Sequence, residues 1–389
     1  MKKETIAIDT PFERRDAFGA LSMPVYNSVA YEFDNANDMA DAFTGRVVAP
    51  DYSRTQNPTV TNLERRVMAL TGAKAVTALN SGISNTIIAL TAAGKNIVTS
   101  RHMFGNTYDL LANTLKRFGV EARFCDLTDI SDVERNVDAN TCCIFFEIIT
   151  NPQMEVADIS KLAAVARKNN IPLVADTTTI PFTMFSVHDL GADIEIVSST
   201  KYLSGGATSL GGLIIDYGTF PDFKKRIKGE MLFNFGAYMT PQVAYLQTLG
   251  LETLSARYHV QASNALTLAK RLHDTEGIKS VNYVGLDDNP FHELAQKQFG
   301  PTAGAMVCID LESQEACFRM LNNLKLVHRA TNLFDSRTLA IHPYSTIYGN
   351  FTTEQRAAMD VHDTTIRLSV GLEDAGDIYD DIVQALRKA

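Results

Sequence analysis

Residues 194–212 read IEIVSSTKYLSGGATSLGG, and this stretch decides how the rest of the sequence is interpreted. Apolar residues at 194, 196 and 197 predict a buried strand, and Lys201 follows it after three hydroxyl residues. An isolated ammonium beside a buried strand is costly to desolvate, but a lysine bonded covalently to an aldehyde cofactor avoids much of that cost. Desolvation also lowers a lysine pKa toward the range in which the amine acts as nucleophile and base. The segment therefore predicts a covalent cofactor site at Lys201, although a Thr-Lys pair taken alone is typical of a surface lysine.

Short apolar, β-branched runs alternate with helical stretches between residues 70 and 216. Several runs are apolar at consecutive positions, as in strands that are covered on both faces. Between them the pattern is helical; for example, Asp158 can cap a helix that ends near Asn169, before Pro172. The sequence therefore predicts an α/β domain with a large, mainly parallel sheet of seven strands. The predicted strands are residues 76–79, 96–100, 121–125, 142–147, 172–176, 194–198 and 212–215.

Two further segments belong to the same predicted site. Residues 172–178, PLVADTT, form an apolar strand that ends in Asp176, at the sheet edge where α/β proteins bind ligands. A carboxylate there can hold a pyridine nitrogen protonated, although Asp176 alone could equally cap a helix. Residues 77–85, TALNSGISN, read as a strand, small residues and a helix start, whose free N–H groups suit a phosphate. Neither GxGxxG nor GKS/T is present in this stretch, so it does not indicate a nucleotide.

The pattern changes from about residue 244. Residues 247–273 predict one long helix, residues 285–290 are rich in Gly, Pro and Asp, and strands are expected near 305–311 and 365–370. A final helix repeats Ile378, Ile382 and Leu386 at four-residue spacing. We therefore predict an N-terminal arm (1–50) that packs elsewhere, a large domain (51–243) and a smaller α+β domain (244–389).

Composition excludes several classes of function. The 389 residues carry a net charge of −9 without a separate basic stripe, which argues against nucleic-acid binding. No apolar run reaches the ~18 residues of a membrane span, and the first residues have no apolar signal-peptide core. The five cysteines are an odd number without the spacing of a metal site, and four lie in apolar runs. The sequence thus predicts a cytoplasmic, metal-free protein without nucleic-acid or membrane partners.

Seven motifs, in this order and spacing, resemble the Cys/Met-metabolism family of pyridoxal-5′-phosphate (PLP) enzymes. They are YSRTQNPT (52–59), SGISN (81–85), FGNTY (104–108), EIITNP (147–152), ADTT (175–178), SSTKY (198–202) and IRLSVGLED (366–374). The resemblance covers nearly the whole chain. It implies the PLP-dependent transferase fold of aspartate aminotransferase (fold type I). It also implies a homodimer as the smallest active unit and a homotetramer as the expected full assembly.

The resemblance also implies a role for each matching residue. Lys201 binds PLP as a Schiff base and later moves protons between Cα and Cβ, while Asp176 pairs with the pyridine nitrogen. Tyr52 and Arg54 match residues that reach the phosphate of the neighbouring subunit, and Arg367 matches the arginine that grips the substrate carboxylate. The expected cofactor-binding set is Tyr52, Arg54, Ser81, Gly82, Ile83, Phe104, Asn151, Asp176, Thr178, Ser198, Thr200 and Lys201. The expected substrate-binding set is Arg367, Asn332, Thr338 and Asn151.

The chain departs from the family pattern at several positions. Phe104 stands where the family has a tyrosine stacked on the cofactor. We predict Phe104 to be a catalytic residue as well, but one that can only stack on the ring, because a phenyl group cannot transfer a proton. Tyr52 or Tyr108 could replace that hydroxyl. Asn106 stands where methionine γ-lyases carry a cysteine, which counts against that activity. Phe334 replaces a glycine and predicts an altered substrate pocket.

Segments 205–212 and 332–348 most resemble O-acetylhomoserine sulfhydrylases. The leading hypothesis is γ-replacement, in which O-acetyl-L-homoserine and sulfide or a small thiol give homocysteine or methionine plus acetate. The alternatives are a γ- or β-lyase that releases a 2-oxo acid, ammonia and a thiol, and a cystathionine γ-synthase. A scaffold without activity is disfavoured, because it has no use for a buried lysine opposite a carboxylate.

Overall fold

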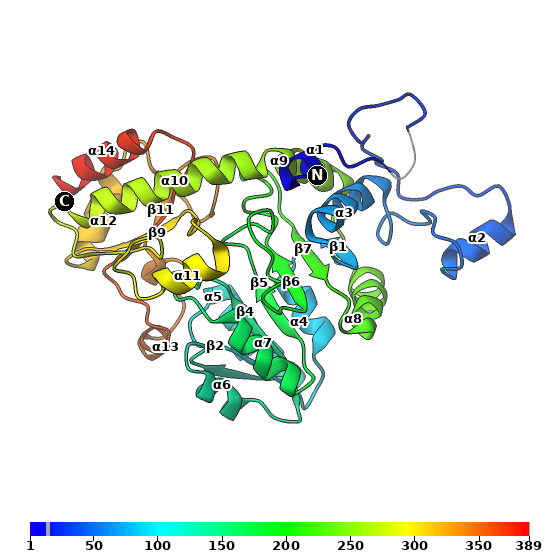
Figure 1. Ribbon diagram of the computed structural model, residues 1–389, viewed down its shortest axis with the longest axis horizontal. Helices are drawn as coiled ribbons and strands as arrows, with labels where there is room; N and C mark the ends of the chain where they lie inside the picture. The colour runs from blue at the N-terminus through cyan, green and yellow to red at the C-terminus, as the bar shows by residue number, and fades with distance from the viewer. Residues whose placement is uncertain (13–15, 389) are drawn as a thin grey trace.

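The computed structural model describes residues 1–12 and 16–388, and its large domain is built on one seven-stranded sheet (Figure 1). The strand order is β1-β7-β6-β5-β4-β2-β3. β7 runs antiparallel to both its neighbours, and the other four pairings are parallel. This confirms the predicted mainly parallel sheet. Its strands are β1 (Ala75–Leu79), β2 (Asn96–Ser100), β3 (Glu121–Cys125), β4 (Thr141–Glu147), β5 (Leu173–Asp176), β6 (Ile194–Val197) and β7 (Gly212–Asp216).

Helices cover both faces of this sheet. In β4, Ile144 and Phe146 belong to one buried cluster, whereas Cys143 and Phe145 belong to another. Both faces of the strand therefore need apolar side chains, which explains why its sequence is apolar without alternation. The helical segments of this domain are α3 (Pro58–Thr71), α4 (Ile83–Leu90), α5 (Gly105–Asp109), η1 (Leu110–Thr114), η2 (Leu115–Phe118), α6 (Ile130–Asn136), α7 (Ile159–Lys168), α8 (Pro221–Arg226), η3 (Ile227–Asn234) and α9 (Pro241–Glu252).

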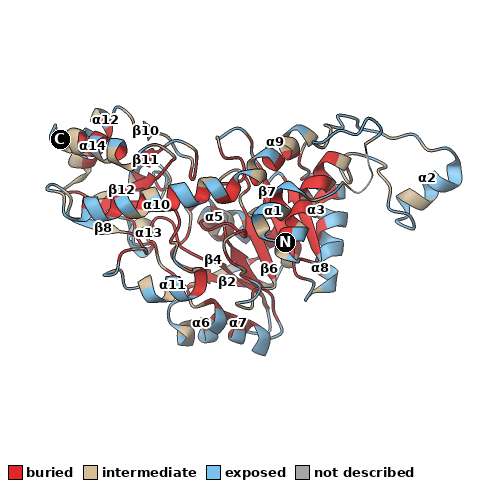
Figure 2. Cartoon of the chain, turned by 45° about the horizontal axis from the view of Figure 1, so that its top comes forward, coloured by how far each residue is buried: buried red, intermediate tan, exposed pale blue. Residues whose placement is uncertain are grey.

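Helix ends follow local sequence signals. Asn57 caps α3 by accepting the Thr59 N–H, Pro58 occupies its first turn, and Gly72 ends it with a left-handed φ of 71°. Asp158 caps α7 as predicted, because its carboxylate accepts the Lys161 N–H. Figure 2 shows the buried strands in the middle of the molecule and exposed outer faces on α6, α7 and α8.

The C-terminal part contains a second, five-stranded sheet in the order β10-β11-β12-β9-β8. The predicted single helix over 247–273 is wrong in one respect: α9 ends at Glu252 and α10 begins at Leu254, with Thr253 outside both helices. α10 then extends from the large sheet to the second one (Figure 1). The elements are α10 (Leu254–His273), β8 (Ser280–Asn282), α11 (His292–Phe299), β9 (Met306–Asp310), α12 (Gln314–Asn323), β10 (His328–Arg329), β11 (Leu339–Ile341), η4 (Pro343–Ser345), α13 (Thr353–Ala358), β12 (Thr365–Ser369) and α14 (Ala375–Leu386).

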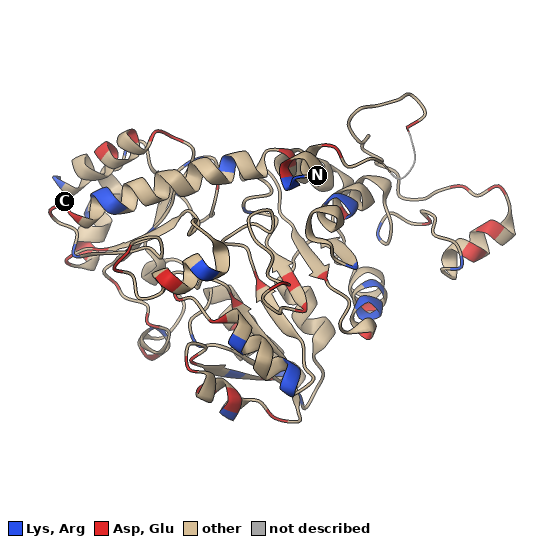
Figure 3. Ribbon diagram, viewed as in Figure 1, with Lys and Arg blue, Asp and Glu red and all other residues tan. Residues whose placement is uncertain are grey.

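The N-terminal region contains two short helices with different surroundings. α1 (Lys3–Ile8) packs against α3 and α9 of its own chain, with Ala7 buried, and Lys3 Nζ donates to the Phe182 carbonyl at 2.8 Å. α2 (Ala36–Phe43) has no buried residue and projects away from the body, and acidic residues are coloured along it in Figure 3. The domain boundaries at 50/51 and 243/244 stay predictions. Among the described residues, no helix is long and apolar enough to cross a membrane.

Candidate active site

Lys201 follows β6 and lies beside a cavity of about 400 Å³. Its Nζ donates a hydrogen bond to Asn332 Oδ1 at 3.0 Å, which joins the large domain to the loop before β11. Burial, assisted by Arg367, lowers the pKa of Lys201 to about 8, and Asp176 opposes the shift. About a tenth of the amine is therefore uncharged at pH 7, far more than for an ordinary lysine, and this form can attack an aldehyde. The cavity is lined by Thr200, Lys201, Ala207, Thr208, Ser209, Leu210, Thr331 and Asn332.

Asp176 ends β5 with its carboxyl group buried. Its Oδ1 accepts the Thr178 N–H at 2.9 Å, and the Thr178 hydroxyl accepts the Ser198 N–H at 2.8 Å. The structure thus brings Asp176, Thr178 and Ser198 together at the carboxyl ends of β5 and β6. Burial raises the pKa of Asp176 to about 6, although Thr178 and Lys201 act in the opposite direction. A cationic ring nitrogen next to this carboxyl would favour its ionised form.

Glu147 is a second carboxyl at this edge, and the sequence analysis gave it no role. It ends β4 and lies directly opposite Asp176 in the parallel register of β4 and β5. Its Oε1 accepts the Phe104 N–H at 3.0 Å, so it holds the residue expected to stack on the cofactor. Burial, followed by the charge of Asp176, raises the pKa of Glu147 to about 8. An acidic residue that ends a buried strand is a signal in the sequence, but the adjacency of β4 and β5 is needed to interpret it.

Arg367, in β12, is fully buried near Lys201. Its Nη1 donates to Asn151 Oδ1 at 3.2 Å and its Nη2 to the Asn332 carbonyl at 3.3 Å. Its Nε has no hydrogen-bond partner among the described residues. Burial lowers the pKa of Arg367 to about 10, so the guanidinium remains charged at neutral pH. A buried cation with an unused N–H requires an anionic partner, and a carboxylate has the matching planar geometry.

The predicted phosphate-binding residues lie around the start of α4. A Cβ on Gly82 would lie 2.6 Å from Ile196 Cγ2, so only glycine lets α4 begin against β6. A Cβ on Gly212 would lie 2.0 Å from the Gly82 nitrogen, which shows how closely the two backbones approach. Residues Ser81, Gly82 and Ile83 therefore lie beside the end of β6 that leads to Ser198.

Thr200 uses its hydroxyl within its own loop. This hydroxyl accepts the Gly211 N–H at 2.9 Å and donates to the Gly211 carbonyl at 3.2 Å. It keeps a free lone pair but no free proton for a phosphate oxygen in this conformation. Its predicted contact with the phosphate therefore requires the hydroxyl to rotate away from Gly211.

Three predicted residues lie outside the group around Lys201. Tyr52 is 41% exposed, and the Arg54 guanidinium lies 5.3 Å from the centre of its ring. Thr338 is buried, but its hydroxyl donates to Glu373 Oε2 at 2.8 Å and accepts the Gly371 N–H. Thr338 thus supports a turn, whereas Tyr52 and Arg54 present polar groups outward, as a contact with another subunit would require.

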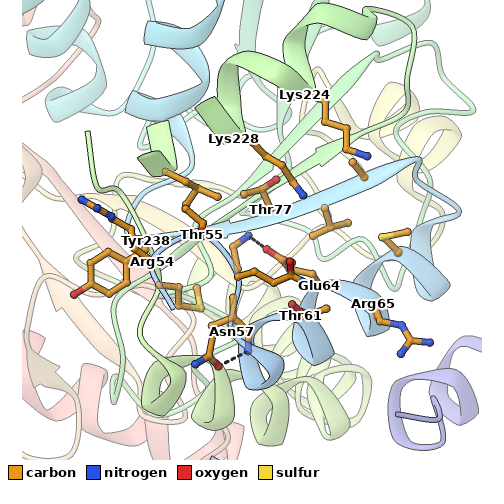
Figure 4. Close-up of a pocket in the computed structure, with 18 of the residues that line it drawn as sticks. Arg54, Thr55, Asn57, Thr61, Glu64, Arg65, Thr77, Lys224, Lys228 and Tyr238 are labelled. Carbon is orange, nitrogen blue, oxygen red and sulfur yellow. Dashed lines mark hydrogen bonds between the residues drawn. The ribbon is translucent and has the colours of Figure 1, made fainter. Parts of the chain in front are cut away.

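Arg54 also lines a separate cavity of about 250 Å³ along β1 (Figure 4). β1 is an edge strand, and Glu64 Oε1 accepts the Ala78 N–H on its unpaired side at 2.9 Å. Burial raises the pKa of Glu64 to about 7, and Lys228 opposes the rise. In Figure 4 Arg54 points away from Glu64. This cavity shares no lining residue with the one at Lys201.

Three aromatic residues near the site, Phe104, Tyr108 and Tyr348, have different surroundings. Phe104 is half-buried at the start of α5, while the Tyr108 ring stacks on Phe124 at 4.5 Å. Tyr348, to which the sequence analysis gave no role, is fully buried. Its hydroxyl lies within hydrogen-bond distance of the carbonyls of Met103 (2.8 Å) and Asn151 (3.0 Å), which share its one proton. It ties the C-terminal part to the loops that carry Phe104 and Asn151. No sequence pattern distinguishes such a tyrosine from an ordinary core residue.

Phe334, which the sequence predicts to alter the substrate pocket, does not line the cavity at Lys201. The ring is fully buried and stacks on Tyr202, with centroids 4.1 Å apart and an interplanar angle of 4°. Its φ of 57° explains why glycine is easier to place there. Phe334 therefore packs on Tyr202, the residue that follows Lys201.

These residues fit PLP and an amino-acid substrate. Lys201 supplies a free amine, Asp176 a buried carboxyl for the ring nitrogen, and the start of α4 supplies N–H groups for a phosphate. The unpaired Nε of Arg367 fits the substrate carboxylate.

Comparisons with known proteins agree with this assignment. The sequence model of the family described as "Cys/Met metabolism PLP-dependent enzyme" matches residues 4–387. The chain is 34% identical over 380 residues to an L-methionine gamma-lyase of Fusobacterium nucleatum subsp. polymorphum, covering 96% of this chain and 95% of that one. It is also 34% identical over 378 residues to an O-succinylhomoserine sulfhydrylase of Pseudomonas aeruginosa, covering 96% and 93%.

A solved structure has the same fold over its full length. A candidate O-acetylhomoserine (thiol)-lyase of Campylobacter jejuni, which contains N′-pyridoxyl-lysine-5′-monophosphate, superposes with a TM-score of 0.95 at 32% identity. The match covers 100% of both chains. The chain described here therefore belongs to the Cys/Met metabolism family of PLP-dependent enzymes.

Proposed function

We propose that this enzyme catalyses γ-replacement on O-acetyl-L-homoserine with sulfide or a small thiol, giving homocysteine or methionine plus acetate. The observation that carries the proposal is Arg367, a buried guanidinium with an unpaired Nε close to Lys201. Arg367 can bind the α-carboxylate of an amino acid, and the neighbouring Lys201 amine can then transfer protons to and from that substrate. The full-length similarity to a candidate O-acetylhomoserine (thiol)-lyase supports the choice of substrate.

The residues around Lys201 have separate tasks in this proposal. PLP, when bound, supplies an electron sink for the carbanion formed at Cα. Lys201, Asp176, Asn151, Ser198 and the start of α4 would hold it. The Lys201 amine, with its pKa near 8, is suited to remove and return protons at Cα and Cβ of the substrate. Loss of the Cγ acetate and addition of sulfide then complete the replacement.

The proposal is tested by incubating PLP-loaded enzyme with O-acetyl-L-homoserine, with and without sulfide. Homocysteine and acetate in equal amounts, formed only when sulfide is present, are the expected products. If neither homocysteine nor acetate forms with both substrates present, the proposal fails.

A γ- or β-lyase is the second candidate, supported by the 34% identity to an L-methionine gamma-lyase. β-Elimination does not require help for a Cγ leaving group, so Phe104 is compatible with it. γ-Elimination would instead release 2-oxobutyrate, acetate and ammonia from O-acetyl-L-homoserine without any added nucleophile. If 2-oxobutyrate appears and homocysteine does not, methionine, cystathionine and cysteine become the substrates to compare.

We also propose a homodimer as the minimal active unit, a homotetramer as the full assembly, and a cytoplasmic location. The outward-facing pair Tyr52 and Arg54 supports a shared site, because neither belongs to the group around its own Lys201. The five cysteines are all free, which suits a reducing compartment.

A further inference from the structure

One short segment contacts both functional cations of the site. The Asn332 side-chain oxygen, Oδ1, accepts a hydrogen bond from Lys201 Nζ at 3.0 Å. The Asn332 backbone carbonyl accepts a second one from Arg367 Nη2 at 3.3 Å. The position of Asn332 therefore sets how the lysine and the arginine lie relative to each other.

Phe334, two residues later, has a backbone conformation that a bulky side chain rarely adopts. Its φ is 57°, in the left-handed region, where glycine and asparagine are the usual residues. Two contacts maintain it: its N–H donates to Ser369 Oγ at 2.6 Å, and its ring stacks on Tyr202 at 4.1 Å. Strained residues persist only where the surrounding structure fixes them, and they are concentrated at functional sites.

Both anchors of Phe334 are neighbours of the functional residues. Tyr202 directly follows Lys201, and Ser369 lies two residues after Arg367 in β12. The stack of Phe334 on Tyr202 thus links the segment that carries Asn332 to the backbone at Lys201. The hydrogen bond to Ser369 links the same segment to β12, the strand of Arg367.

We infer that Phe334 is a positioning residue, whose stack on Tyr202 holds Asn332 between Lys201 and Arg367. Without the stack, the segment is free to relax from the left-handed conformation and to withdraw the Asn332 amide oxygen from the lysine. The inference rests on the site of the proposed function but does not depend on which reaction that site performs.

The experiment measures the Lys201 amine directly. Cofactor is removed from the enzyme and its re-uptake is followed by visible absorbance as a function of pH, because only the uncharged amine attacks the aldehyde. Asn332 Oδ1 stabilises the ammonium, so its withdrawal lowers the pKa of Lys201. Asp176 and Arg367, the charged groups facing the lysine from β5 and β12, stay in place. The uptake midpoint of F334L is expected to move down by about one pH unit, the size of one hydrogen bond to a charged group.

Two further variants separate positioning from packing. Y202L removes the stack from the other side and should give the same shift, and the double variant should shift no further. F299L breaks the edge-on pair of Phe185 and Phe299 elsewhere in the core. It should lower thermal stability while leaving the uptake midpoint unchanged.

Steady-state kinetics of the holoenzyme give an independent readout. F334L should raise KM for the amino-acid substrate as well as lower kcat, because the segment also contacts Arg367. A midpoint of uptake that is unchanged in both F334L and Y202L would overturn the inference, whatever the products of the reaction are. The shift seen in both variants without homocysteine formation would leave the inference intact and refute the proposed function instead.

Discussion

Replacing Glu147 with glutamine tests how the two buried carboxyls share the sheet edge. Glu147 lies opposite Asp176, and its pKa rises from an ordinary 4.5 to about 8 because it is buried and faces that charge. The difference, 8 minus 4.5, is about 3.5 pH units and corresponds to roughly 5 kcal/mol. Glutamine keeps an oxygen for the Phe104 N–H but has no proton to lose.

The direction in which pH changes the free energy of unfolding follows from the protons that Glu147 binds in the folded and unfolded states. Between about pH 4.5 and 8 the folded chain retains the Glu147 proton, while the unfolded chain has lost it. The unfolded state then binds fewer protons, so the free energy of unfolding decreases as pH rises through this window. The wild-type protein should lose up to about 5 kcal/mol across it from this residue, and E147Q should not.

The assay is denaturant unfolding of cofactor-free protein at about pH 5 and about pH 8.5, with wild type and E147Q side by side. E276Q, which removes an exposed carboxylate after α10, serves as the matched control and should follow wild type. The pH dependence should be smaller in E147Q than in either of the others. If all three proteins lose the same stability between the two pH values, the reasoning about the buried pair is refuted.

Three further perturbations have defined outcomes. Arg54→Ala should weaken PLP retention in dialysis by about tenfold, as expected for losing one charged contact, while Lys201 still forms its covalent bond; unchanged retention would contradict the shared site. Arg367→Lys should raise KM for the amino acid by about tenfold to hundredfold, because lysine cannot reproduce the planar two-point contact; an unchanged KM would remove Arg367 from substrate binding. Tyr348→Phe should destabilise the protein by about 1–2 kcal/mol in denaturant unfolding, because the carbonyls of Met103 and Asn151 lose the donor that they share; no loss would show that this hydrogen bond does not contribute to stability.

The sheet could be predicted from sequence because both of its faces are buried. A strand such as β4, with apolar residues on consecutive positions, is typical of a sheet that is covered on both faces. The break between α9 and α10 could not be predicted, since Thr253 interrupts an otherwise continuous helical pattern without a proline or glycine. Its non-helical conformation depends on tertiary packing.

Some residues of the site could likewise be predicted from the sequence, and others could not. Lys201 and Asp176 could be identified because each is an ionisable group at the end of an apolar strand. Glu147 carries the same signal, yet its importance comes from the pairing of β4 with β5, which sequence does not specify. For Phe334, a local reading predicted a pocket residue, whereas its stack on Tyr202 depends on the arrangement of both domains.

The central claim is that Lys201 carries the cofactor, and it can be tested by trapping. The PLP-loaded enzyme is reduced with borohydride, digested, and analysed by mass spectrometry for the peptide that carries the pyridoxyl group. The account predicts that the modification is on Lys201 and that Lys201→Ala protein acquires none and has no turnover. Modification of another lysine, such as Lys228 in the cavity along β1, or normal turnover of Lys201→Ala, would contradict it.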